Sequence, residues 1–153
     1  MSVNVTVSRE IKASPQQVWD LISDLTRMGE WSPENEGGTW LKGAEGAAVG
    51  AKFRGANRNG KRRWKTVATV IHADPAERLT FRTAVLGLPD AEWSYVLEPT
   101  ELGCRVTESF TDQRPGWLKP VSAVVSGVKD RESHNRSGMQ QTLVRLAQAA
   151  EAA

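Results

Sequence analysis

The stretch that decides the fold is Phe53–Phe81, FRGANRNGKRRWKTVATVIHADPAERLTF. It contains three runs in which apolar and polar residues alternate, and two turn signals separate them. Asn59-Gly60 suits a two-residue type I′ hairpin, and Asp74-Pro75 begins a second turn. Because strands joined by such short turns pair antiparallel, this stretch predicts the centre of an antiparallel meander.

The same alternation continues on both sides of this stretch. A first strand is expected near the N-terminus, where Val3, Val5, Val7 and Ile11 share one face. The remaining strands are expected at about Gly38–Lys42, Lys52–Asn57, Arg62–Ala73, Arg78–Thr83, Ala91–Glu98 and Cys104–Thr111. The pattern therefore predicts a curved antiparallel sheet of about seven strands.

Short helices should follow the first strand. In ASPQQVWDLISDL, Ser14 suits an N-cap, Pro15 the first helical position and Gln17 the third, which completes a capping box. The next segment, Met28–Trp40, MGEWSPENEGGTW, reverses the chain and carries two tryptophans. A turn normally runs over the protein surface, where an aromatic ring gains little free energy from burial. We therefore expect Trp31 and Trp40 to line or cover a cavity.

One long helix is expected to close the chain, from about Leu118 to Ala150. A bend is expected near Gly127 and a close approach to the sheet at Gly138, since glycine is costly inside a helix without such a reason. The order of elements predicts an α+β fold and one domain over residues 1–150.

Composition excludes several classes of protein. The 153 residues carry a net charge of +2, which gives no general attraction to nucleic acid or to an anionic membrane and leaves only a local charged patch open. The N-terminus alternates instead of forming an apolar run, so neither a signal peptide nor a membrane-spanning segment is expected, and we expect a cytoplasmic location. The single cysteine, Cys104, excludes an internal disulfide and is expected to be an inert core thiol rather than a nucleophile.

Three segments resemble a known family: ASPQQVWDLISDLTRMGEWSPE (13–34), FRGANRNGKRRWKTVATVIHADPAERLTF (53–81) and HNRSGMQQTL (134–143). With them the chain resembles the START-like superfamily, also called SRPBCC or Bet v1-like, in its bacterial polyketide cyclase/dehydrase branch. The resemblance implies a helix-grip fold with a deep apolar cavity between the sheet and the long helix. Members bind lipids, sterols, polyketides or other hydrophobic molecules, and some are cyclases.

Polar residues interrupt two apolar faces that should border such a cavity. Glu132 and Asn135 fall on the apolar stripe of the last helix, and Glu108 falls on an apolar strand face. A buried carboxylate needs a partner, water or a ligand. Alternatively, Glu132 pairs with Arg131 or Arg136 at the edge of the packing, and a dry, filled core replaces the cavity.

The residues expected to contact a ligand are Trp31, Trp40, Trp64, Phe81, Trp93, Tyr95, Glu108, Val128, Glu132, Asn135 and Met139. No metal-ligand spacing is present, so His72 and His134 are expected to be surface or structural residues, and no metal or cofactor is expected. The basic NRNGKRRWK segment (57–65) is expected to form an exposed hairpin tip rather than a nucleic-acid-binding site.

These patterns favour a protein that binds a hydrophobic or amphipathic small molecule. One alternative is a cyclase/aromatase-type enzyme, without cofactor, in which Glu108 or Glu132 acts as acid or base. A second alternative is a module in which AVLGLPD (84–90) docks on a protein or a membrane. By the resemblance, AVLGLPD and RPGWLKP (114–120) flank the cavity mouth; otherwise they pack on the rim of the domain or form a homodimer contact.

Overall fold

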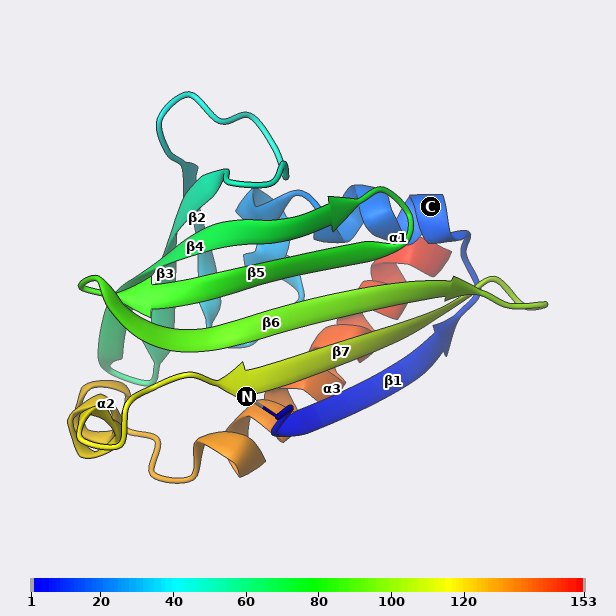
Figure 1. Ribbon diagram of the computed structural model, residues 1–153. Helices are drawn as coiled ribbons and strands as arrows, with labels where there is room; N and C mark the ends of the chain where they lie inside the picture. The colour runs from blue at the N-terminus through cyan, green and yellow to red at the C-terminus, as the bar shows by residue number, and fades with distance from the viewer. Residues whose placement is uncertain (1, 153) are drawn as a thin grey trace.

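The computed structural model describes residues 2–152 and contains a curved sheet of seven antiparallel strands, crossed on one face by a long helix (Figure 1). The order in the sheet is β1-β7-β6-β5-β4-β3-β2. The strands are β1 Val5–Ile11, β2 Asn35–Trp40, β3 Lys52–Asn59, β4 Arg62–Asp74, β5 Arg78–Val85, β6 Leu88–Pro99 and β7 Cys104–Asp112. The sheet and its helix confirm the predicted helix-grip class, and β1 closes the order by pairing with β7.

The turn between β3 and β4 differs in detail from the prediction. Asn59 pairs with Arg62, so the two-residue loop is Gly60-Lys61 rather than Asn59-Gly60. Only Gly60 has a positive φ there, 61°, which fits a type II′ turn with glycine at the first central position. The hairpin forms as expected, but Gly60 is the first central residue of the turn instead of the second.

The first helices lie as predicted. Helix α1, Pro15–Ile22, begins with the complete Ser14–Gln17 capping box, and the short 3-10 helix η1, Leu25–Glu30, follows with Asp24 as its cap. Cys104 is fully buried, and burial raises the pKa of its thiol, as expected for an inert core cysteine.

The single C-terminal helix was a wrong prediction, because the chain forms two helices there. Helix α2, Leu118–Ser126, ends at Gly127 in the left-handed conformation, and α3, Arg131–Glu151, begins after Asp130, whose side chain accepts from the Ser133 amide. The expected bend is therefore a complete break. Gly138 does not approach the sheet: its nearest neighbour would be Pro33, at an ordinary 3.7 Å from an added Cβ.

The filled part of the core lies toward β1, β7 and α1. There the C-terminal half of α3 buries Leu143, Leu146, Ala147 and Ala150 against the sheet and α1. Helix α2 lies at the opposite end of the molecule, beside the tip of the β3–β4 hairpin and at the same end as the β5–β6 turn (Figure 1). Close packing at one end leaves space at the other, and the site described next occupies it.

Candidate functional site

A pocket of about 470 Å³ lies between the concave face of the sheet and helices α2 and α3. Successive side chains of a strand point to opposite faces, so along most of β3 to β7 every second residue lies on the pocket wall. The alternating residues on this wall are Phe53, Gly55, Asn57, Trp64, Thr66, Ala68, Phe81, Thr83, Ala91, Trp93, Tyr95, Glu108 and Phe110. Most of these side chains are apolar or aromatic, so the few polar atoms on the wall stand out.

Glu108 is the most unusual of them. It lies on β7 opposite Tyr95 on β6, and the Tyr95 hydroxyl donates to Glu108 Oε2 at 2.9 Å. Glu108 Oε1 is buried and has no hydrogen-bond partner among residues 2–152. Burial raises the pKa of this carboxyl to about 8, although the bond from Tyr95 acts in the opposite direction. At neutral pH the carboxyl is therefore mostly protonated and has one O–H to donate.

A second carboxyl, Asp90, lines the pocket near its α2 end. The Thr83 hydroxyl donates to Asp90 Oδ2 at 2.8 Å. Burial raises the pKa of Asp90, and the bond from Thr83, together with the charges of Arg131 and Arg114, offsets part of that rise. The wall thus carries two separate carboxyl groups, those of Glu108 and Asp90, among mostly apolar side chains.

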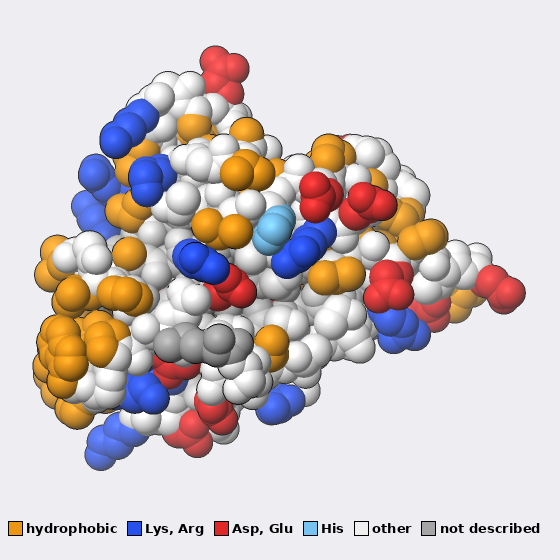
Figure 2. Space-filling model, in the orientation of Figure 1, with side chains coloured by type: hydrophobic (Ala, Val, Ile, Leu, Met, Phe, Trp, Pro, Cys, Tyr) orange, Lys and Arg blue, Asp and Glu red, His pale blue; other side chains and the backbone are white. Residues whose placement is uncertain are grey.

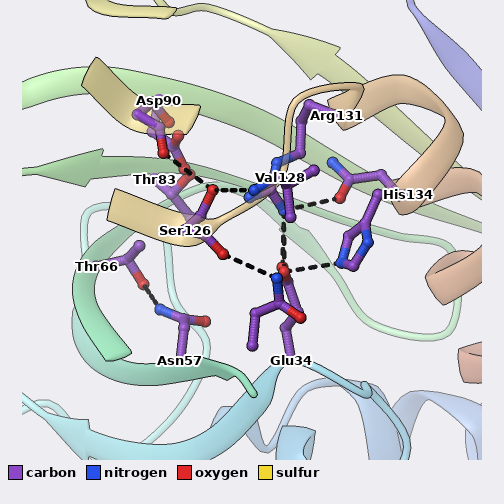
Figure 3. A network of polar contacts seen from close by, with 12 residues as sticks. Glu34, Asn57, Thr66, Thr83, Asp90, Ser126, Val128, Arg131 and His134 are labelled. Atoms are coloured by element: carbon purple, nitrogen blue, oxygen red, sulfur yellow. Dashed lines mark hydrogen bonds and ion pairs between the residues drawn. The ribbon is translucent and has the colours of Figure 1, made fainter. Parts of the chain in front are cut away.

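An ion-pair network joins α3 to the segment before β2 at the edge of the pocket (Figure 3). Arg131 Nη1 donates to both oxygens of Glu34, at 2.9 and 3.1 Å, and also to Asn135 Oδ1 at 3.2 Å. His134 Nε2 lies 2.9 Å from Glu34 Oε2. The Arg131 guanidinium also lies 5.9 Å from the ring centre of Trp64. The network ties the helix to the pocket rim.

The structure brings seven of the sequence-predicted residues together around this pocket. They are Trp64, Phe81, Trp93, Tyr95, Glu108, Asn135 and Met139. The other four, Trp31, Trp40, Val128 and Glu132, are not part of its lining.

Each of those four lies elsewhere for a physical reason. Trp31 is fully buried behind η1, where the Arg27 guanidinium stacks on its ring, and Trp40 packs edge-on against Phe53. Val128 lies in the break between α2 and α3, off any helical stripe. Glu132 is exposed in the first turn of α3 and accepts from Asn4 Nδ2 at 2.7 Å, not from either neighbouring arginine.

Sequence reasoning missed Glu34, Arg131 and Asp90 and underestimated His134. Glu34 lies about a hundred positions from its partners on α3, and no local periodicity connects the two segments. Asp90 follows a turn and a proline, and a charged residue at such a position is normally exposed to solvent. Only the fold itself brings these groups together.

Two features are absent from the described part of the chain. Residues 2–152 contain no cluster of three or more His, Cys, Asp or Glu side chains that could hold a metal ion. None of their helices is long and apolar enough to span a membrane.

Comparison with known proteins gives a consistent picture. Residues 2–151 match the family model described as polyketide cyclase/dehydrase and lipid transport. The solution structure of the polyketide cyclase-like protein Cgl2372 from Corynebacterium glutamicum is 31% identical, with a TM-score of 0.66, over 98% of this chain and 93% of that one. No curated protein matches.

Two further structures share the fold at lower identity. Protein CV1439 from Chromobacterium violaceum has a TM-score of 0.68 at 18% identity, over 96% of both chains. The di-domain ARO/CYC protein StfQ of the steffimycin biosynthetic pathway has a TM-score of 0.74 at 11% identity, over 96% of this chain and 50% of that one. At these identities the likeness shows the fold alone.

Proposed function

The chain belongs to the polyketide cyclase/dehydrase and lipid transport family, and from this premise we propose that its pocket binds a hydrophobic small molecule, such as a lipid or a polyketide, with a polar oxygen at one end. The observation that carries the proposal is Glu108, a buried acid with one unpaired oxygen on an apolar wall. A ligand carbonyl or hydroxyl oxygen that accepts from this acid would satisfy it.

The energetics support such a ligand. A buried polar atom without a partner costs about 1–3 kcal/mol, and the cost disappears when a hydrogen bond forms. The pocket volume of about 470 Å³ is typical of small-molecule sites, which hold about 300–1,000 Å³. An apolar body would contact Trp64, Phe81 and Trp93, while the polar end would reach Glu108.

Native mass spectrometry of freshly purified protein, followed by titration with the neutral dye N-phenyl-1-naphthylamine, tests the proposal. Ala68 lies on the pocket wall, so Ala68→Phe should fill part of the pocket and weaken dye binding about tenfold or more. Thr69→Phe, one residue along on the other face of β4, is the matched control and should bind as the wild type does. If the wild type binds neither a co-purified molecule nor the dye, or if both variants bind equally, the proposal is wrong.

Enzymatic activity of the cyclase type is a second candidate, and the raised pKa of Glu108 favours it. A carboxylic acid with a pKa of about 8 can act as a proton donor near neutral pH. Glu108→Gln keeps the size of the side chain and removes its acidity. A binding protein should then change affinity only modestly, whereas an enzyme that uses this acid should keep binding and lose turnover by about a hundredfold or more.

A further inference from the structure

Large apolar side chains gather in solvent at the end of the molecule that carries α2 (Figure 2). Leu86, in the β5–β6 turn, is 96% exposed, and Trp117, at the start of α2, is 65% exposed. Val121, Val124 and Val125 on α2 are exposed as well. We call these five residues the apolar end patch. Exposed apolar side chains that gather at one end of a molecule mark an interaction surface more often than single scattered ones do.

Leu86 is the most informative member of the patch. Leu86 and Gly87 form a two-residue turn between paired Val85 and Leu88, and both have positive φ, 51° and 79°. Such a turn normally takes Asn-Gly, because a branched side chain is strained at positive φ. In the isolated domain Leu86 has an unfavourable backbone conformation, and its side chain is not buried, so it contributes nothing to stability. A contact outside the domain would account for it.

The surface beside the patch is strongly basic. Between Gly46 and Ala73 the chain carries seven Lys and Arg residues and no Asp or Glu, although its overall net charge is only +2. The exposed members at the β3–β4 hairpin tip and just beyond it are Arg58, Lys61, Arg62, Arg63 and Lys65.

Two contacts hold the hairpin tip against α2, where the apolar end patch lies. Arg62 donates to the Val124 carbonyl, and Asn59 Nδ2 donates to the Ser126 carbonyl at 2.8 Å. Lys119 and Lys129 add positive charge, and residues 113–129 contain no acid. The projecting apolar groups therefore lie near segments in which basic side chains predominate.

We propose that this end of the domain docks on an anionic phospholipid bilayer. Leu86, Trp117 and Val124 would enter the interfacial layer, and the basic hairpin would lie at the lipid headgroups. The apolar groups project from a turn and a short helix, a shape that suits insertion. A second copy of the chain is a poorer occupant, because a two-fold interface through this patch would bring two basic hairpins together.

Docking would also place the pocket beside the lipid. Leu86, Trp117, Val121 and Val125 line the pocket as well as belonging to the patch. This link to ligand uptake rests on the proposed function, whereas docking itself does not.

Co-sedimentation with vesicles of phosphatidylcholine, with and without phosphatidylglycerol, tests the proposal with the full chain. Binding should require the anionic lipid and should weaken with added salt. Asparagine tolerates a positive φ, so Leu86→Asn should keep the fold. It removes an apolar side chain, so vesicle binding should fall about tenfold. Lys61→Glu combined with Arg63→Glu should also lower binding about tenfold or more.

Leu102→Asn is the matched control, since Leu102 is an exposed leucine in the connection at the opposite end of β6, and it should bind as the wild type does. Absence of binding to anionic vesicles would overturn the proposal, and so would an equal loss in the two leucine variants. A dimer in solution that Leu86→Asn disrupts would also overturn it, in favour of an interface between copies. Glu108→Gln should keep vesicle binding, so failure of the ligand proposal can be told from failure of docking.

Discussion

The buried carboxyl of Glu108 should make the domain less stable as the pH rises from about 4.5 to about 8. In the folded chain burial raises its pKa from 4.5 to about 8. Within this window the folded state keeps a proton that the unfolded state has released, so the free energy of unfolding falls by about 1.4 kcal/mol per pH unit. Below the window both states are protonated and the loss vanishes; across the whole window it reaches about 5 kcal/mol.

Glu108→Gln removes the titration while keeping an acceptor for the Tyr95 hydroxyl. Urea unfolding of the ligand-free protein, followed by tryptophan fluorescence at about pH 5, 6, 7 and 8, gives the free energy of unfolding. The variant should resemble the wild type near pH 5 and exceed it by about 4 kcal/mol near pH 8. Glu132→Gln, which changes an exposed carboxyl, should follow the wild type throughout.

Equal pH slopes for the wild type and Glu108→Gln would refute this reasoning. The Glu108 carboxyl would then be ionised or well solvated in the folded protein, and it could not present an O–H to a ligand. A slope that changes in Glu132→Gln as well would show that the effect does not come from burial at Glu108.

Three further predictions concern other parts of the structure. Gly127→Ala should lower the unfolding free energy by about 1–2 kcal/mol in urea titrations, because φ is 75° and the new Cβ would lie 2.7 Å from Arg62 Cδ; Gly116→Ala, in open space, should cost less. Glu34→Gln should change stability by less than about 1 kcal/mol yet speed dye release a few-fold in stopped-flow fluorescence, because its partners on α3 close the rim. Cys104 should react with Ellman's reagent only at denaturant concentrations that unfold the protein.

Local patterns predicted the sheet because each strand and turn is encoded by neighbouring residues. Alternation placed β3 to β7 nearly at their observed bounds, and the Asn-Gly pair placed the β3–β4 hairpin to within one residue. The helix break escaped prediction for an equally local reason. The sequence around Gly127 predicts a bend within one helix, because the apolar spacing continues across this glycine, and that spacing does not mark Asp130 as the cap of a second helix.

The site could be predicted only where it depends on local periodicity, either of the strands or of the last helix, as for Asn135. The alternation within each strand predicted that Glu108 and Tyr95 both face the cavity, and the structure joins them by a hydrogen bond. Glu34 and Arg131 belong to segments that meet only after the sheet has curved and α3 has crossed it. Their charges suit exposed positions, so nothing near them in sequence pointed to a site.

The length of the C-terminal segment explains why the helix has to break. A continuous helix over residues 118–150 would be about 50 Å long, whereas even the 13-residue strand β4 extends only about 43 Å. One rod would therefore extend beyond the sheet, and its first turns would contact nothing. The break at Gly127 instead lets α2 fold across the end of the pocket. One side of α2 then lines the pocket, and Val124 on its other side is exposed to solvent. The helix break at Gly127 therefore creates both this part of the pocket wall and the proposed membrane surface.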